Sequence, residues 1–276
     1  MWNQETENHS VSDKKYLVPF ILITSLFFLW GFARAILDVL NKHFQNALHI
    51  SITQSALIQV TTYLGYFLMA IPAGIFINKY GYRRGVVFGL LLFGLGAIFF
   101  IPGASIGSFS AFLFCLFVIG CGLVFLETAA NPYVTELGAR ETATSRLNLS
   151  QSFNGLGSIF ATFCIGQFLF NDTQQGGNVV IPYAILGVLV LAIAVVFSRV
   201  DLPEIQHRQT NEDKAKGSNI AKLFANHRMF VFGLFALLSY EVAEISINSY
   251  FINFVTGMHW MSYRTASLVL TLSLAF

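Results

Sequence analysis

Five ionisable side chains lie inside otherwise apolar stretches of the sequence, where they would meet the interior of a lipid bilayer. They are Arg34, Asp38, Glu127, Glu241 and Glu244, and the other 25 charged residues lie in polar loops and tails. An ionisable group inside a bilayer costs at least about 2.5 kcal/mol on insertion scales, so such residues usually have a partner or a function. These five residues are therefore the first candidates for chemistry.

Glu127 has the clearest functional pattern. It is the one acid in its apolar run, and Asn131 follows four residues later on the same helix face. A low dielectric favours the neutral form of a carboxyl, which can then take up and release a proton. The alternative is a structural Glu that joins helices through hydrogen bonds. We predict that Glu127 couples a proton and that Glu127 and Asn131 contact the substrate.

Asp38 lies four residues after Arg34 in the first apolar run. An ion pair between the two, or an Asp solvated near the membrane interface, would be structural. In a water-filled cavity, Asp38 would instead be a second protonatable group or a hydrogen-bond acceptor for a sugar. We predict that Asp38 takes part in both proton coupling and substrate binding.

Glu241 and Glu244 share a helix face, and Asn248 continues it. Two carboxylates this close should not both ionise in a low dielectric, so at least one is protonated or faces water. We predict that Glu244 and Asn248 line a cavity, whereas the role of Glu241 stays open.

Amide and hydroxyl side chains extend this set to two further apolar runs. They are Gln151 and Asn154, with Asn148 one turn earlier, and Gln59, Tyr63 and Tyr66. Amides bind hydroxyl groups and aromatic rings cover apolar faces, a combination that suits a polyhydroxylated ligand. Interhelical hydrogen bonding is the alternative for any one of them. The combination across four helices predicts that Gln59, Tyr63, Gln151 and Asn154 bind substrate.

Transmembrane helices must position these residues. Hydrophobic residues make up 55% of the chain and charged residues 11%, against roughly 25% charged in soluble proteins. This excludes a soluble enzyme, a nucleic-acid-binding domain and a disordered chain. Runs long enough to span a bilayer occur at 16–40, 52–77, 86–102, 108–135, 148–170, 179–197 and 230–255, and an eighth begins near Thr265. The fold class is therefore an all-α polytopic membrane bundle.

Patterns typical of enzymes and metal sites are absent from the sequence. It contains no HExxH, nucleophile elbow or Walker A motif, and its six histidines lie outside the apolar runs without ligand spacing. Cys115, Cys121 and Cys164 lie in apolar runs and are expected to be small buried residues. We expect no enzymatic activity, cofactor, metal or nucleic-acid partner.

Basic residues orient the bundle. With the N-terminus in the cytoplasm, thirteen Lys and Arg residues lie inside and two outside, which satisfies the positive-inside rule. The predicted organisation is a cytoplasmic tail at 1–15, a six-helix half at 16–198, a cytoplasmic linker at 199–229 and an incomplete second half at 230–276. Residues 220–228 fit either a helix on the membrane surface or a polar loop. Because the sequence stops inside an apolar run, we expect it to be part of a longer protein.

Several segments resemble a known family. Residues 74–85, GIFINKYGYRRG, are similar to the cytoplasmic signature of the major facilitator superfamily, with Asn78 and Lys79 in place of its Asp and first Arg. Residues 65–74 (GYFLMAIPAG), 126–138 (LETAANPYVTELG) and 146–157 (RLNLSQSFNGLG) resemble its bacterial L-fucose–proton symporter branch, which includes glucose/galactose transporters.

The resemblance implies a twelve-helix fold, of which this chain holds the first six helices, the seventh and part of the eighth. It assigns sugar recognition and proton coupling to Asp38 and Glu127, and it matches Gln151 and Asn154 to amides of the fifth helix. Residues 243–246 (AEIS) resemble a pattern of the relatives that supports Glu244 as a cavity residue. Arg34 and Ala35 stand where the fucose member has Asn residues, which changes the donors near the sugar.

The resulting hypothesis is a proton-coupled sugar importer that works by alternating access. A proton-coupled exporter of the same superfamily and a sugar sensor that does not transport are the alternatives. We expect a multi-pass protein of the bacterial inner membrane, monomeric at full length, whose partners are a small sugar, protons and lipid. We do not expect residues 1–276 to transport alone, because each half of such a protein supplies one wall of the site.

Overall fold

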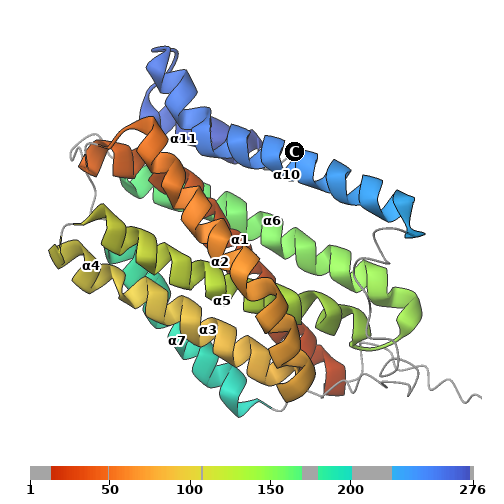
Figure 1. The fold of residues 1–276 in the computed structure, drawn as a ribbon. Helices are drawn as coiled ribbons and strands as arrows, with labels where there is room; N and C mark the ends of the chain where they lie inside the picture. Colours follow the sequence, from red (N-terminus) through yellow and green to blue (C-terminus); the bar gives the residue numbers. More distant parts are fainter. Residues whose placement is uncertain (1–13, 49, 107, 170–179, 201–225, 274–276) are drawn as a thin grey trace, which may run out of the picture.

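The computed structural model describes residues 14–48, 50–106, 108–169, 180–200 and 226–273 (Figure 1). Its helices are α1 (Lys14–Leu48), α2 (Ile52–Tyr80), α3 (Tyr82–Ile98), α4 (Phe100–Ile106), α5 (Phe109–Glu136), α6 (Ala143–Leu169), α7 (Val180–Arg199), α10 (Arg228–Gly257) and α11 (Tyr263–Ser273), with a 3₁₀ turn at Arg140–Thr142. The described residues contain no strand, so the predicted all-α fold is confirmed.

Six spans among the described residues are long and apolar enough to cross a membrane. They lie in α1, α2, α3 with the start of α4, α5, α7 and α10. The predicted span at 148–170 is present as α6 but is not among the six, because amide, hydroxyl and glycine residues interrupt its apolar sequence. It nevertheless packs along α1 inside the bundle (Figure 1).

Apolar side chains on the outer face of α2 are open rather than packed. Leu68, Ile71 and Ile75 are 50%, 70% and 63% exposed. Such a continuous apolar surface on a polytopic bundle is the kind that lipid covers. The core lies on the opposite side of the helices, where Phe27, Phe93 and other large side chains are fully buried.

The third predicted span is divided in the structure. α3 ends at Ile98, and Phe99 separates it from α4 while keeping a helical backbone. Pro102 has no backbone N–H, and its ring would clash with the carbonyl four residues earlier, at Ile98. The proline therefore accounts for the break inside a segment that spans from Tyr82 to Gly103.

Small residues let α1 and α6 approach closely, as they do in many membrane bundles. A Cβ atom at Gly31 of α1 would overlap the backbone carbonyl of Asn154 on α6, and a Cβ at Gly157 would overlap the carbonyl of Phe28. Only glycine fits at these two positions. This contact fixes the backbone of Asn154 on α6 against α1, beside Gly31 and its neighbour Trp30.

Replacing Gly31 by Ala should therefore separate α1 from α6 and lower the melting temperature of the purified protein by several degrees. Gly155→Ala on α6 is the matched control, because a Cβ there meets nothing within 4 Å. Alanine normally stabilises a helix interior by roughly 0.5–1 kcal/mol relative to glycine, so the control should be unchanged or more stable. Equal melting temperatures for the two variants would contradict the close approach.

Arg146 ties the start of α6 to the end of α5. Its buried guanidinium donates to the backbone carbonyls of Val134 at 3.1 Å, Thr135 at 2.8 Å and Ala139 at 2.7 Å. Carbonyl groups at a helix C-terminus lack partners within the helix and favour a cation. These hydrogen bonds stabilise the turn between α5 and α6 and thereby help position α6 beside α5.

The signature-like turn between α2 and α3 is held in a similar way. Arg83 donates from Nε to the carbonyl of Phe197 at 3.3 Å and from Nη2 to that of Ser198 at 2.5 Å. It thereby joins the start of α3 to the end of α7. Asn78, which replaces the family's Asp, is exposed.

α10 and α11 pack on the side of the bundle formed by α1 and α6 (Figure 1). Ser267 of α11 donates to the carbonyl of Thr162 on α6 at 3.1 Å, and Thr271 donates to the Thr162 hydroxyl at 3.0 Å. The predicted linker at 199–229 falls largely outside the described residues, as do the predicted tail up to residue 13 and most of the possible surface helix at 220–228.

Candidate functional site

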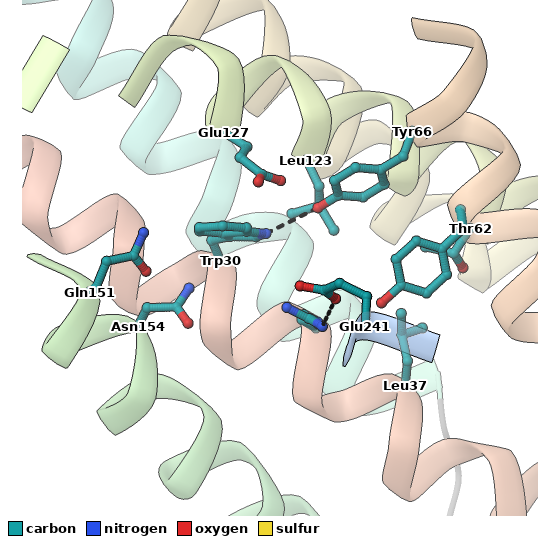
Figure 2. A pocket seen from close by; sticks show the side chains of 11 residues that line it. Trp30, Leu37, Thr62, Tyr66, Leu123, Glu127, Gln151, Asn154 and Glu241 are labelled. Carbon is teal, nitrogen blue, oxygen red and sulfur yellow. Dashed lines mark hydrogen bonds and ion pairs between the residues drawn. The ribbon is translucent and has the colours of Figure 1, made fainter. Parts of the chain in front are cut away.

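A cavity of about 370 Å³ lies where α1, α2, α5, α6 and α10 meet (Figure 2). Its lining consists of Trp30, Arg34, Leu37, Thr62, Tyr63, Tyr66, Leu123, Glu127, Gln151, Asn154 and Glu241. Ligand pockets of proteins usually measure about 300–1,000 Å³, so this cavity has room for a small molecule.

Helical spacing explains which residues of each element reach the cavity. On α1, Trp30, Arg34 and Leu37 follow one another at steps of four and three residues, which keeps them on one face. Gln151 and Asn154 on α6 are three residues apart and share a face in the same way. Each helix therefore contributes one short stripe of side chains.

Glu127 is half-buried on α5 and borders two spaces. It lines the cavity and also a second hollow of about 630 Å³ between α2 and α5, which includes Asn131 and Thr128. Figure 2 shows its carboxyl directed toward Trp30 and Tyr66. Asn131 donates at 3.3 Å to the backbone carbonyl of Glu127 and not to the carboxylate. The position suits a group that exchanges a proton between the cavity and a second opening.

An aromatic wall faces this carboxyl. The indole Nε1 of Trp30 donates to the hydroxyl of Tyr66 at 3.0 Å, and the rings of Tyr63 and Tyr66 lie 5.8 Å apart. The hydrogen bond holds Trp30 in place between α1 and α2 (Figure 2). Trp30 is not among the residues predicted from the sequence, although it lies one helical turn before Arg34 on the same face.

Two amides on α6 face the aromatic wall (Figure 2). Asn154 is half-buried, and Gln151 donates from Nε2 to the Oδ1 atom of Asn131 at 3.3 Å. Asn131 therefore lines the neighbouring hollow and reaches the cavity only through Gln151. Asn148, one turn earlier on α6, is exposed and does not line the cavity.

Arg34 pairs across helices. Its Nη2 atom lies 3.2 Å from Oε2 of Glu241 on α10, and both side chains line the cavity. One alternative from the sequence was an ion pair between Arg34 and Asp38, but the side chain of Asp38 is not among those the structure describes. The structure thus answers the open question about Glu241, and the roles predicted for Asp38 stay predictions.

Besides Asn131, three predicted binding residues lie outside the lining of this cavity. Glu244 and Asn248 on α10 are half-buried but are not among the lining residues, and Tyr240 hydrogen-bonds to Glu244 on the same helix. Gln59 donates from Nε2 to the hydroxyl of Ser249 at 2.8 Å, so its amide joins α2 to α10. The part of α10 that faces the cavity is one turn earlier than predicted, at Glu241.

The arrangement can bind a neutral, hydroxyl-rich molecule and accept a proton. Amide, hydroxyl, guanidinium and carboxylate groups surround an aromatic wall, which is how proteins bind rings that carry hydroxyls on their edges. No group of three or more His, Cys, Asp or Glu side chains among the described residues could hold a metal ion.

Known proteins with similar sequences belong to one superfamily of transporters. The sequence model described as Major Facilitator Superfamily matches residues 23–276. The chain is 37% identical over 231 residues to the L-fucose-proton symporter of Haemophilus influenzae, covering 74% of this chain and 54% of that protein. It is 36% identical to the L-fucose-proton symporter of Escherichia coli (91% and 64% covered) and 35% identical to a glucose/galactose transporter of Brucella abortus (92% and 62%). The chain thus spans less than two thirds of the length of these relatives.

Solved structures show the same similarity. The major facilitator superfamily transporter FucP in its outward conformation superposes with a TM-score of 0.72 at 34% identity, covering 95% of this chain and 69% of that one. A D-xylose-proton symporter gives a TM-score of 0.73 at 12% identity, with 95% and 66% covered. The second match shows the fold alone. These relatives are transporters, not enzymes.

Proposed function

The chain belongs to the major facilitator superfamily, and on that premise we propose that it takes part in proton-coupled import of a small neutral sugar. The resemblance of its sequence motifs to the fucose symporter and glucose/galactose transporter branch is confirmed by the relatives it matches. The sugar, the proton and the direction of transport are our proposals for this protein.

One observation carries the proposal: an acidic side chain and two amides converge on an aromatic wall inside a membrane bundle. Glu127, Gln151 and Asn154 come from two helices and face Trp30 across the same 370 Å³ cavity. An intramembrane carboxyl is expected to have a function because its insertion is costly. Neutral amides and a tryptophan ring together suit a sugar better than an apolar cargo, which disfavours the exporter alternative.

The origin of the lining residues supports alternating access. Most come from α1, α2, α5 and α6 of the predicted first half, whereas Glu241 comes from α10, after the predicted linker. In transporters built from two halves, the site lies between them and opens to each side in turn. We propose that Glu127 and Asp38 bind the proton, and that the sugar contacts Asp38, Glu127, Gln151 and Asn154.

Sugar binding tests this proposal. Isothermal titration with L-fucose, D-galactose and D-glucose should show saturable binding of at least one of them by the protein expressed from its native reading frame and purified in detergent. Uptake of the bound sugar into proteoliposomes under an inward proton gradient then separates a transporter from a sensor. Binding without any uptake would favour the sensor, and no binding of any of the three would contradict a sugar site.

The proposed orientation places the N-terminus in the cytoplasm. In a background without Cys115, Cys121 and Cys164, we expect a cysteine at Ser262 to react with an impermeant thiol reagent added to intact cells. A cysteine at Glu141 should react only after the cells are opened. Both residues are exposed, so access depends on the side of the membrane. The reverse pattern would overturn the orientation that the basic residues predict.

A further inference from the structure

We propose that Glu241 determines specificity: by pairing with Arg34 inside the cavity, it reserves the site for uncharged sugars and excludes sugar acids. This inference rests on the proposed function, because it defines which sugars the same cavity accepts. It starts from one contact, the 3.2 Å distance between Nη2 of Arg34 and Oε2 of Glu241.

The pair is open to a ligand rather than enclosed by packing. The side chains of Arg34 and Glu241 are 34% and 40% exposed, and both line the cavity. Figure 2 shows Glu241 entering the cavity from α10, on the side away from Gln151 and Asn154. A molecule that enters the cavity therefore meets this pair directly.

An unpaired Arg34 would be a strong site for an anion. A guanidinium presents parallel N–H donors that match a carboxylate, and such charge-assisted pairs are about twice as strong as neutral hydrogen bonds. Glu241 occupies that partner position with a carboxylate of the protein itself. The carboxylate of a hexuronate would have to displace Glu241, whose own charge would then lie unpaired in the cavity.

The other charged groups around Arg34 also disfavour an anionic ligand. Among the described residues that line the cavity, Arg34 is the one cation, while Glu127 from α5 and Glu241 from α10 are acids. Glu244 follows on α10 one turn later. An anionic ligand therefore meets no net positive charge in this lining. It would also lie close to carboxylates of the same charge, which disfavours its binding. Neutral hydroxyls can still accept from the Arg34 guanidinium or donate to the Glu241 carboxylate.

The test is Glu241→Gln, which keeps the shape of the side chain but removes its charge. We expect the ratio of the binding constant for D-galacturonate to that for D-galactose to rise at least about tenfold. Both constants are measured by isothermal titration at the same pH and salt concentration. The same should hold for D-glucuronate relative to D-glucose. Glu241→Ala should show the same direction, so the result does not depend on one variant folding well.

Two controls separate local pairing from overall charge. Glu136→Gln also removes one negative charge, at the exposed end of α5, and should leave the ratio of the two affinities unchanged. The double variant Arg34→Gln with Glu241→Gln removes the cation as well and should lose the gain. An unchanged ratio in both Glu241 variants, or an equal gain in Glu136→Gln, would overturn the inference about Glu241. The proposed function would still stand in that case if the wild type binds galactose. A wild-type protein that binds none of the neutral sugars would overturn both.

Discussion

In the protein expressed from its native reading frame, replacing Glu127 by Gln should reduce proton-driven sugar accumulation in proteoliposomes to the level of liposomes without protein. Glutamine has nearly the same shape as glutamic acid but cannot release a proton at this position. Because Glu127 borders both the cavity and the neighbouring hollow, its loss should disconnect the proton from the sugar. Exchange of labelled for unlabelled sugar across the membrane, which needs no net proton movement, should persist in the variant.

Glu136→Gln is the matched control for this experiment. It makes the same change on the same helix, at an exposed position outside the cavity lining, and should accumulate sugar as the wild type does. Proton-driven accumulation that survives in Glu127→Gln would assign the proton to another carboxyl, with Asp38 the next candidate. Loss of both accumulation and exchange would show that Glu127 is needed for sugar binding itself.

Asn154→Leu should weaken sugar binding by about ten- to a hundredfold. A leucine fills a similar volume but leaves sugar hydroxyls without a partner, and a buried polar group left unpaired costs about 1–3 kcal/mol. The backbone of Asn154 contacts Gly31 on α1, and this contact does not depend on the side chain. The helix should therefore keep its place while the cavity loses one amide.

Asn148→Leu makes the identical change on the same helix, at an exposed position outside the cavity. It should bind sugar with the affinity of the wild type in isothermal titration. Equal losses in the two variants would indicate a general effect on α6 rather than a sugar contact at Asn154. Wild-type affinity in Asn154→Leu would remove this residue from the proposed site.

The fold could be predicted largely from apolar runs, because a bilayer requires helices of about 20 apolar residues. α6 shows where that rule weakens. Two of its polar residues line the cavity and others hydrogen-bond to α1 and α11, so its composition is less apolar although it packs along α1. The division at Phe99 was within reach of the sequence too, since Pro102 marks it, but a proline inside a helix can also produce only a kink.

The site was harder to predict at α10. Glu241, Glu244 and Asn248 share one helix face, so spacing alone gives no reason to prefer one of them. Asn248 lies seven residues after Glu241, a rise of about 10 Å along a helix, and depth relative to the other helices decides which of these residues meets the cavity. Depth depends on how the helices pack, and the structure places Glu241 at the level of Arg34.

The sequence did identify the residues of α5 and α6 that the structure brings together. Glu127, Gln151 and Asn154 line one cavity, together with Tyr63 of α2. Trp30 was missed because an aromatic residue in an apolar run gives no signal of its own. Its role follows from a partner, Tyr66, which lies 36 residues away in the sequence and 3.0 Å away in space.

The most direct test of proton-coupled sugar import is the pH of a weakly buffered suspension of cells that express the protein from its native reading frame. Adding L-fucose, D-galactose or D-glucose one at a time should, for the transported sugar, raise the external pH transiently as protons enter with it. The same addition to cells that express the Glu127→Gln variant should produce no change. Saturable uptake of labelled sugar by the wild type without any rise in external pH would contradict proton coupling, and a rise of equal size in the variant would contradict the role of Glu127.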